Sequence, residues 1–403
     1  MKNQIIKHSK HQFTEGDVEH WWHEETQRGI RTRFSDDLLW LAYVTIEYIE
    51  FTGDRTILEI KTPFLQGEVL EENQDEKYDK YTQTHEEQTI YNHCIKAIEK
   101  ALNFGEHGLP KIGSGDWNDG FSTVGNKGKG ESVWLGFFLY LILEKFIPIC
   151  KEKGDYEKAE KYEQIKINLK KALNTKAWDG RWYKRAYMDD GNWLGSMENE
   201  ECRIDSIAQS WSTISNAGDN DKKYISIESL ENHLVDRENG GQYTHSSCWV
   251  IIAESLLGFG DKAVELYKMI NPIEHSRTKE SSTKYKVEPY VIPADIYGAS
   301  NLAGQGGWTW YTGSSSWYYK AGIEYILGLK INEGYLEINP CIPRDWKNYE
   351  IQYKWKETIY NIEVKNPNRK NTGVTKVLLN GDETKNHIKL DGTRKIYKVE
   401  ILL

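Results

Sequence analysis

Residues 131–178 read ESVWLGFFLYLILEKFIPICKEKGDYEKAEKYEQIKINLKKALNTKAW, two helical patterns that meet at Gly154-Asp155. The spacing of the apolar residues predicts helices over 131–155 and 156–178, and the glycine predicts where the first one ends. The same form predicts further helices over 35–54, 85–105, 245–270 and 312–330. Recurring helices separated by long polar loops rich in Gly, Trp and Asp indicate a mainly α fold of paired helices, an α/α toroid rather than a four-helix bundle.

The pattern changes after about residue 331. Tyr349, Ile351, Tyr353 and Trp355 alternate with polar residues, as in a strand with one buried face. Asn380-Gly381 predicts a tight hairpin, and KIYKVEILL predicts a strand that closes the chain. We therefore expect two domains, a helical domain over 1–330 and a small C-terminal all-β module over 331–403.

The composition excludes some classes of partner and favours others. The chain has 403 residues, a net charge of −9, 15 Trp and 25 Tyr against only 10 Phe. An acidic chain of this kind argues against a nucleic-acid binder. Trp and Tyr offer an apolar face and a polar edge, which suits a carbohydrate cleft, and a large aromatic core explains the same bias equally well. The five Cys form no CxxC and predict neither disulfides nor a zinc site.

The targeting signals that the sequence offers are few. MKNQIIKHSKHQF has no apolar segment of a signal peptide. The longest apolar run, within 133–150, is interrupted by Glu144 and Lys145, so we expect no membrane span. The expectation is a cytoplasmic protein.

GSGDWNDGF (113–121) is the first stretch that can carry chemistry. It is not a GxGxxG motif and no Walker lysine follows it, so it does not predict a phosphate loop. A carboxyl of Asp116 or Asp119 held against the indole of Trp117 would have a raised pKa and could act as a general acid. A turn capped by the two Asp side chains fits the stretch equally well.

QRGIRTRFSDDLLW (27–40) is the second such stretch. Arg31, Arg33, Asp36 and Asp37 can bind vicinal hydroxyls of a sugar, or they can pair with each other and cap a helix. Just before it, GDVEHWWHEE adds a pair of Trp that can form a sugar platform, flanked by His20 and His23.

Three later stretches add candidates for binding an anion or a sugar. His245 opens a predicted helix and can hold an anion there, although a lone His is more often structural. Thr312, Gly313 and Ser314 open another, either as a second anion site or as a helix cap with a glycine hinge. Polar and aromatic residues of the kind that line a sugar cleft complete the set: Glu288, Tyr290, Gln305, and the run CRIDSIAQSW at 202–211.

Together these stretches resemble glycoside hydrolase family 94, the inverting disaccharide and oligosaccharide phosphorylases. The matches are GDVEHWW, RTRFSDDLLWLAY, GLPKIGSGDWNDGF, GESVWLGFFL, CRIDSIAQSW, GGQYTH and GGWTWYTGSSSW, in order from about residue 11 to 320, with PCIPRDW opening the C-terminal β module. These motifs are most similar to those of the phosphorylase-like C-terminal region of cyclic β-1,2-glucan synthases and of β-1,2-oligoglucan phosphorylases.

The resemblance implies a fold and a set of roles. The fold would be an (α/α)6 toroid catalytic domain followed by the β module. Asp119 would be the general acid, with Asp116 and Trp117 shaping the sugar pocket. Phosphate would bind at His245, Thr312, Gly313 and Ser314. Arg31 and Asp37 would bind the donor sugar, with Arg33 and Asp36 as close substitutes for them. Inorganic phosphate would be a co-substrate, and no metal or other cofactor is implied.

The implied activity is reversible inverting phosphorolysis of β-linked gluco-oligosaccharides, β-1,2 in first place, to α-glucose 1-phosphate. Three alternatives stay open: a β-1,4 (cellobiose- or cellodextrin-type) phosphorylase, a non-catalytic glucan-binding remnant of a glucan synthase, and a hydrolase with Glu288 as second acid. The resemblance implies a large N-terminal β-sandwich before the barrel, and the first match in this sequence already begins at about residue 11. We therefore expect a homodimer or association with such an N-terminal portion.

Overall fold

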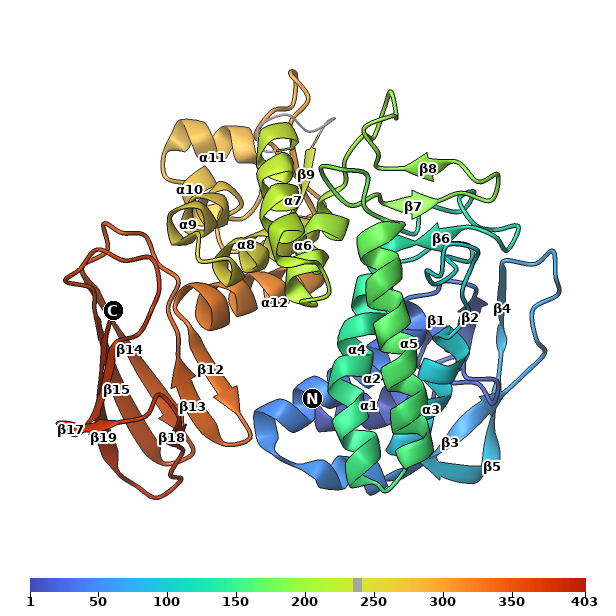
Figure 1. The fold of residues 1–403 in the computed structure, drawn as a ribbon, viewed down its shortest axis with the longest axis horizontal. Helices are drawn as coiled ribbons and strands as arrows, with labels where there is room; N and C mark the ends of the chain where they lie inside the picture. Colours follow the sequence, from blue (N-terminus) through green and yellow to red (C-terminus); the bar gives the residue numbers. More distant parts are fainter. Residues whose placement is uncertain (235–240) are drawn as a thin grey trace. The chain divides into compact units, whose positions relative to one another are not determined.

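The computed structural model describes residues 1–234 and 241–403 (Figure 1). The chain divides into two compact units. The first consists of Met1–Ala208 and Ser215–Lys223, and the second of Gln209–Ile214 and Tyr224–Leu403. The boundary at residue 330 that the sequence suggests lies inside the second unit, and an independently folding C-terminal module stays a prediction.

The first unit combines helices with small sheets. Its sheets have the strand orders β1-β2-β4, β3-β5 and β6-β7-β8, and every pairing in them is antiparallel. Its elements are α1 (Lys2–Ser9), β1 (Glu19–His23), β2 (Arg28–Thr32), α2 (Asp37–Thr52), the 3-10 helix η1 (Arg55–Glu59), β3 (Lys61–Gln66), β4 (Glu76–Lys80), β5 (Thr82–Thr89), α3 (Ile90–Ala101), β6 (Glu131–Ser132), α4 (Val133–Glu152), α5 (Tyr156–Thr175), β7 (Ala186–Tyr187) and β8 (Trp193–Leu194).

The second unit also combines helices with strands, and α6 (Ser206–Ile214) and α7 (Asn220–His233) are divided between the two units. Its other elements are β9 (Gly241–Tyr243), α8 (Thr244–Leu256), α9 (Gly260–Met269), α10 (Pro272–His275), α11 (Lys279–Tyr285), β10 (Asp295–Tyr297), β11 (Gly306–Gly307), α12 (Thr312–Lys320), the π-helix η2 (Ala321–Ile326), β12 (Leu329–Asn332), β13 (Tyr335–Ile338), β14 (Asn348–Trp355), β15 (Thr358–Lys365), β16 (Lys376–Leu379), β17 (Asp382–Thr384), β18 (Ile388–Lys389) and β19 (Ile396–Leu402). The chain is therefore helix plus sheet, while the six-fold toroid stays a prediction.

Helices α2 to α5 form the core of the first unit (Figure 1). α4 packs against α5 and α2, and its Trp134, Phe137 and Phe138 are fully buried. Polar caps set where the paired helices begin. The Ser132 hydroxyl accepts a hydrogen bond from the Leu135 N–H at the start of α4, and Asp155 caps α5. The pair predicted from residues 131–178 is confirmed.

α4 is the one helix, among residues 1–234 and 241–403, that is long and apolar enough to cross a membrane. Within the protein, 83% of its most apolar window is buried, as expected of a core helix. Its length and composition alone are therefore a weak argument for a membrane span.

Three predicted helices are shorter than the sequence suggests. The helix predicted over 85–105 begins only at Ile90, because strand β5 occupies the residues before it. The helix predicted over 245–270 is broken into α8 and α9, because Gly258 adopts a left-handed φ of 86° between them. The helix predicted over 312–330 ends in the π-helix η2, after which the chain enters strand β12.

Residues 329–403 contain the predicted strands. β14, β15, β19, β16 and β17 form a five-stranded sheet in that order, with β15 and β19 parallel. Asn380 and Gly381 connect β16 to β17 with φ values of 54° and 96°, so the hairpin predicted from this dipeptide is confirmed. β19 is the predicted closing strand.

His93 in α3 makes the stability of the first unit depend on pH. Its buried imidazole lies 2.7 Å from Gln12 Oε1 through Nδ1 and 2.9 Å from Thr62 Oγ1 through Nε2. Burial lowers the pKa of His93 to about 4, against a small opposing contribution from the Thr62 backbone. The unfolded chain, with an ordinary histidine pKa near 6.5, therefore binds a proton that the folded chain does not between pH 6.5 and 4.

We expect the free energy of unfolding, measured by urea titration, to fall by about 2–3 kcal/mol between pH 7 and pH 4.5 on account of His93. The stability is fully present above pH 6.5 and is lost as the pH falls toward 4. His93→Gln keeps polar partners for Gln12 and Thr62 and should flatten that part of the curve. Identical pH dependence in the two proteins would contradict this assignment.

Candidate functional site

The loop 113–121 lies between α3 and α4 and docks on the segment before α2. Phe34 pairs with Gly113 and Gly115, and the Ser35 N–H donates to the Gly115 carbonyl at 3.0 Å. Gly113 has a φ of +65°, and a Cβ there would lie 2.1 Å from the carbonyl oxygen of the residue before Phe34. Only glycine permits this approach, which holds the two motifs singled out from the sequence side by side.

Asp116 is the fixed acid of this loop. Arg185 forks onto its carboxylate with bonds of 2.6 and 2.7 Å, the Ser132 hydroxyl donates at 2.7 Å and the Asn118 N–H at 3.0 Å. Each carboxylate oxygen thus accepts two bonds, and the side chain is fully buried. Asp116 holds the loop in place, and these bonds do not favour the direct sugar contact predicted for it. Trp117, which follows, is half-buried.

Asp119 is the second acid, and its side chain is 65% exposed. His20 Nε2 lies 4.0 Å from Asp119 Oδ2, while His20 Nδ1 lies 2.8 Å from Asp37 Oδ2. Desolvation by the surrounding protein raises the pKa of Asp119. The His20 charge opposes this, and the charges of Asp37 and Asp116 add to it. The net shift is upward, which is the direction that a general acid near neutral pH requires.

Asp36, which precedes α2, adds a buried carboxyl to the group formed by Asp37, Asp116 and Asp119. Trp40 Nε1 donates to Asp36 at 2.9 Å. Burial, followed by the charge of Asp37, raises the pKa of Asp36 well above its usual range. Burial alone would lower the pKa of His20, but its hydrogen bond to Asp37 and the charges of the neighbouring Asp residues outweigh it and raise that pKa. Strongly perturbed groups of this kind mark a candidate site.

A cavity of about 330 Å³ opens beside His20 and Asp37. Its wall is formed by α1, β1, α2 and the residues between them, and it includes His11, Trp22 and Trp40. Trp22 stacks on His11 with ring centres 3.7 Å apart, so one of the two Trp predicted to form a platform packs within the wall. This volume lies at the low end of the range for small-molecule sites.

Arg31, predicted to bind the donor sugar, is committed to the protein itself. Its guanidinium makes five hydrogen bonds, to Asp17, Glu15 and the carbonyls of Gly67 and Glu68, which uses all five of its N–H donors. It also stacks over the Phe13 ring at 4.0 Å and is 1% exposed. These bonds give Arg31 a structural role at β2 and leave it no N–H for a sugar.

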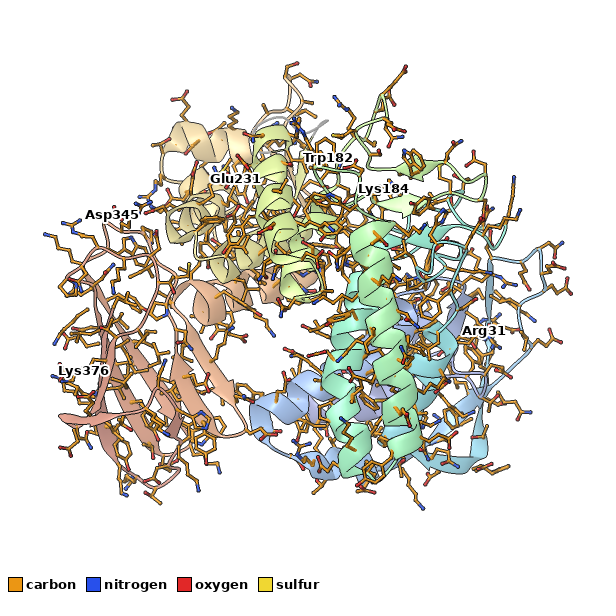
Figure 2. All side chains as sticks on the ribbon, in the orientation of Figure 1. Arg31, Trp182, Lys184, Glu231, Asp345 and Lys376 are labelled. Carbon is orange, nitrogen blue, oxygen red and sulfur yellow. The ribbon has the colours of Figure 1, made fainter. Side chains whose placement is uncertain are left out.

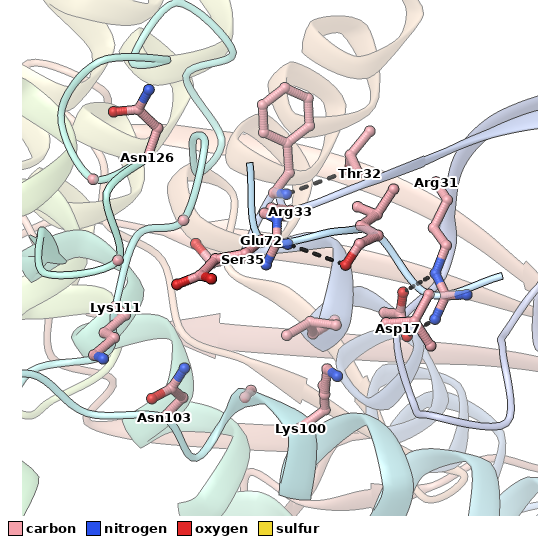
Figure 3. Close-up of a pocket in the computed structure, with 18 of the residues that line it drawn as sticks. Asp17, Arg31, Thr32, Arg33, Ser35, Glu72, Lys100, Asn103, Lys111 and Asn126 are labelled. Atoms are coloured by element: carbon pink, nitrogen blue, oxygen red, sulfur yellow. Dashed lines mark hydrogen bonds and ion pairs between the residues drawn. The ribbon is translucent and has the colours of Figure 1, made fainter. Parts of the chain in front are cut away.

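Arg33 lies half-exposed at a different cavity from Asp37. It donates to the carbonyls of Gln74 and Glu71 and lines a cavity of about 570 Å³ (Figure 3). Lys100 and Lys111 line the same cavity, which makes its wall basic. Asp37 lines the smaller cavity instead, so the structure separates the Arg33 and Asp37 side chains that the sequence groups together.

The predicted phosphate-binding residues lie together in the second unit, at the N-termini of two packed helices. His245 lies in the first turn of α8, and Thr312, Gly313 and Ser314 begin α12. A Cβ on Gly313 would lie 3.6 Å from His245 Cε1. Thr312 and Gly313 are exposed, whereas the Ser314 hydroxyl is buried and accepts a hydrogen bond from Thr244 Oγ1 at 2.9 Å.

The charge state of His245 suits an anion site of a particular kind. Burial lowers the pKa of His245 to about 4, so the ring is neutral near pH 7. The imidazole packs beside Trp249 at 4.8 Å. A neutral ring next to two helix N-termini can offer an N–H to an anion, with the helix dipoles supplying the favourable potential.

The predicted sugar-binding residues after α11 lie on an exposed aromatic surface. Glu288 accepts hydrogen bonds from Thr309 Oγ1 at 2.6 Å and Trp310 Nε1 at 3.2 Å, and these donors lower its pKa. Tyr290 is 73% exposed and Trp308 is 81% exposed. Gln305 is half-buried, and its backbone carbonyl accepts from the Tyr297 N–H, so the structure gives it a place in the loop but shows no role for its side chain.

A metal centre has no ready ligand set in the part of the chain that the structure describes. No group of three His, Cys, Asp or Glu side chains in residues 1–234 and 241–403 is placed to hold an ion.

The family is decided by a comparison that spans most of the chain. The model of the glycosyl hydrolase 94 superfamily catalytic domain matches residues 1–238 and 235–328. This chain belongs to the glycosyl hydrolase 94 superfamily. The family resemblance predicted from the ordered motifs is confirmed.

Several curated members of the glycosyl hydrolase 94 superfamily are similar to this chain. The cyclic beta-(1,2)-glucan synthase NdvB of Rhizobium meliloti (strain 1021) is 40% identical over 95% of this chain and 14% of its own length. The N,N'-diacetylchitobiose phosphorylase of Vibrio furnissii is 27% identical over 89% of this chain and 46% of its own. The 1,2-beta-oligoglucan phosphorylase of Listeria innocua serovar 6a is 23% identical over 87% and 36%. The chain spans less than half the length of each.

The site of this glycosyl hydrolase 94 chain contains residues that sequence reasoning did not single out. His20 appeared only as a neighbour of the Trp pair, yet it touches both Asp37 and Asp119. Arg185, which holds Asp116, lies 69 residues further along the chain in a stretch with no recognisable motif. The signal for His20 was its place inside the ordered motif GDVEHWW.

The Asp116–Arg185 pair should dominate the stability of the loop. Arg185→Met leaves the Asp116 carboxylate buried without its cation, which should lower the free energy of unfolding by about 3–5 kcal/mol in urea titrations. Arg344→Met is the control, because Arg344 pairs with Asp261 at the surface and such pairs contribute little. Equal effects of the two substitutions would show that the buried pair is not the anchor of the loop.

Proposed function

We propose that this chain carries the catalytic residues of a glycoside phosphorylase that cleaves β-linked gluco-oligosaccharides with inorganic phosphate. The product would be α-glucose 1-phosphate, formed reversibly and with inversion. One observation carries the proposal: Asp119 stands exposed at the tip of a loop anchored by a buried ion pair, and desolvation there raises its pKa. The family confirmed above supports the same reaction class.

The reaction assigns one event to each group. Asp119 gives its proton to the glycosidic oxygen, which leaves with the electron pair of its bond to C1. A phosphate oxygen attacks C1 from the opposite face and forms the new bond, so the configuration at C1 inverts. Positioned acids of this kind contribute roughly 10²–10⁴ in rate.

Phosphate would bind where the His245 ring meets the first turn of α12. The exposed Thr312 hydroxyl and the backbone N–H groups of that turn are donors, and both helix dipoles favour a negative charge. The Ser314 hydroxyl is already bonded to Thr244, so in this proposal Ser314 contributes its N–H.

A hydrolase would need a base that activates water instead of an anion site. Glu288 is the candidate for that base, and one of its oxygens accepts from Thr309 and the other from Trp310. Two fixed donors favour a role for Glu288 in holding the loop. The hydrolase alternative is therefore weaker than the phosphorylase.

The linkage we propose is β-1,2, which rests on the relatives named for β-1,2-glucans. A β-1,4-specific phosphorylase is the alternative enzyme, and a non-catalytic glucan-binding remnant is the alternative of another class. We further propose a cytoplasmic location, an (α/α)6 toroid, and a homodimer or association with an N-terminal β-sandwich portion.

The linkage is tested by running the reaction in reverse. The chain is incubated with glucose 1-phosphate and a panel of β-glucosyl acceptors while phosphate release is measured. Release with sophorose and not with cellobiose is expected. Release with cellobiose alone would support the β-1,4 alternative, and no release with any acceptor would favour the remnant.

Asp119→Asn tests the acid. Because the amide has no proton to donate, we expect phosphorolysis of the preferred oligosaccharide to fall by at least about a hundredfold while sugar binding, followed by calorimetry, is retained. Asp345→Asn is the matched control, an exposed residue in the loop between β13 and β14 (Figure 2). Near wild-type turnover in Asp119→Asn would refute the assignment.

Thr312→Val tests the anion site. Loss of one hydrogen bond to a charged group should raise the KM for phosphate roughly tenfold or more while the KM for the oligosaccharide changes little. Ser314→Ala is the contrast, because its hydroxyl is bonded to Thr244 and its loss should lower stability instead. A larger effect of Ser314→Ala on the KM for phosphate would reverse the two roles.

A further inference from the structure

His20 sits at an irregular point of its strand. β1 and β2 pair as Glu19 with Arg31 and Trp21 with Ile30, so His20 is the extra residue of a β-bulge. Bulges re-aim side chains and are common beside active sites. On the facing strand, Gly29 pairs with Trp22, and a Cβ on it would lie 2.9 Å from the Trp21 carbonyl oxygen, so there is little room for a side chain beside the bulge.

The re-aimed imidazole lies between two carboxyls from different elements. Nδ1 is 2.8 Å from Asp37 Oδ2 on α2, and Nε2 is 4.0 Å from Asp119 Oδ2 on the loop before α4. The Phe34 ring packs against the imidazole at 4.9 Å. The first distance is a hydrogen bond that fixes the ring, and the second is an ion-pair distance that leaves Asp119 free to turn toward a sugar oxygen.

Charged groups beside this ring come from the start of α2, from the loop before α4 and from its own strand, and His8 of α1 lines the same cavity. α2 contributes Asp36 and Asp37, and the loop contributes Asp119 together with Asp116, whose charge Arg185 already balances. On its own strand Glu19 is paired with His11. His20 lies within 4.0 Å of both Asp37 and Asp119 and can supply a positive charge to each.

We propose that His20 is a positioning residue for the acid: held by Asp37 through Nδ1, it shares one proton with Asp119 through Nε2. The proposal rests on Asp119 acting as the general acid of the proposed function. Asp37 then has a second task besides any contact with sugar, because it fixes the tautomer and the direction of the ring.

The proton balance of one turnover follows. Asp119 loses its proton to the leaving sugar oxygen and becomes a carboxylate. Because the pair shares a single proton, the His20 ring is neutral while Asp119 carries that proton, and the ring is still neutral when the proton has left with the sugar. The proton that restores the shared one is the one that hydrogen phosphate releases to solvent when its oxygen bonds to C1. The net result is one proton moved from phosphate to the leaving sugar.

The first experiment measures the coupling without enzyme turnover. The His20 titration is followed by NMR of the ring in the full chain and in Asp119→Asn. Removing the negative neighbour should lower the midpoint of the His20 titration by about one pH unit. His107→Gln is the matched control, since His107 pairs with Glu131 elsewhere in the first unit. It should leave the His20 midpoint unchanged.

The second experiment is the pH profile of kcat/KM for phosphorolysis. His20→Asn keeps an amide that can reach Asp37 but removes the ring nitrogen facing Asp119, so the acid should titrate about one pH unit higher. The alkaline limb should move upward by that amount, with little change in the KM for the oligosaccharide. If His20→Asn does not fold, His20→Gln serves, because it also removes the charge.

The outcomes separate the two hypotheses. A His20 titration unmoved by Asp119→Asn, or an alkaline limb unmoved in both His20 variants, overturns the role of His20. A chain that performs no phosphorolysis refutes the proposed function, and the NMR titration then still decides whether His20 and Asp119 share a proton.

Discussion

The buried ion pair between Asp116 and Arg185 is the constraint on which the rest of the first unit's site depends. A carboxylate and a guanidinium taken out of water cost several kcal/mol each unless their hydrogen bonds are complete. Here Ser132 and the Asn118 N–H complete the bonds of the Asp116 carboxylate, and Arg185 Nε lies 3.4 Å from Asp205 Oδ2. Ser132 also caps α4, so one hydroxyl ties the loop to the main core helix. The loop is held at its base, which leaves its tip free for chemistry.

Because the loop is anchored beside the start of α2, several carboxyls lie close together. Asp36, Asp37 and Asp119 lie near Asp116, and the charges of Asp37 and Asp116 raise the cost of ionising Asp36 and Asp119. The protein offsets part of that cost with the Trp40 indole on Asp36 and with the His20 ring between the other two. Asp36, Asp119 and His20 therefore have shifted pKa values, as expected of a site where protons are transferred.

Local signals predicted more of the fold than of the site. The α4–α5 pair and the Asn380-Gly381 hairpin follow from caps and turn residues a few positions away, and both are confirmed. Arg31 shows the limit. Its partners lie 14 to 37 residues away, so nothing in RTRFSDD indicated that its five donors were already used. The bulge that aims His20 was hidden for the same reason, since it exists only in the pairing with β2.

Desolvation raises the pKa of Asp119 in the first unit and lowers that of His245 in the second, and both shifts suit the proposed phosphorolysis. Around Asp119 it disfavours the carboxylate and raises the pKa, which suits the general acid proposed above. Around His245 it disfavours the imidazolium, so the ring is neutral. A phosphate bound there would interact with N–H donors and helix dipoles. No full positive charge would then reduce its nucleophilicity. A hydrolase has no need of the second arrangement, because its nucleophile is a water molecule activated by a carboxylate. A neutral His245 therefore fits the phosphate site proposed above.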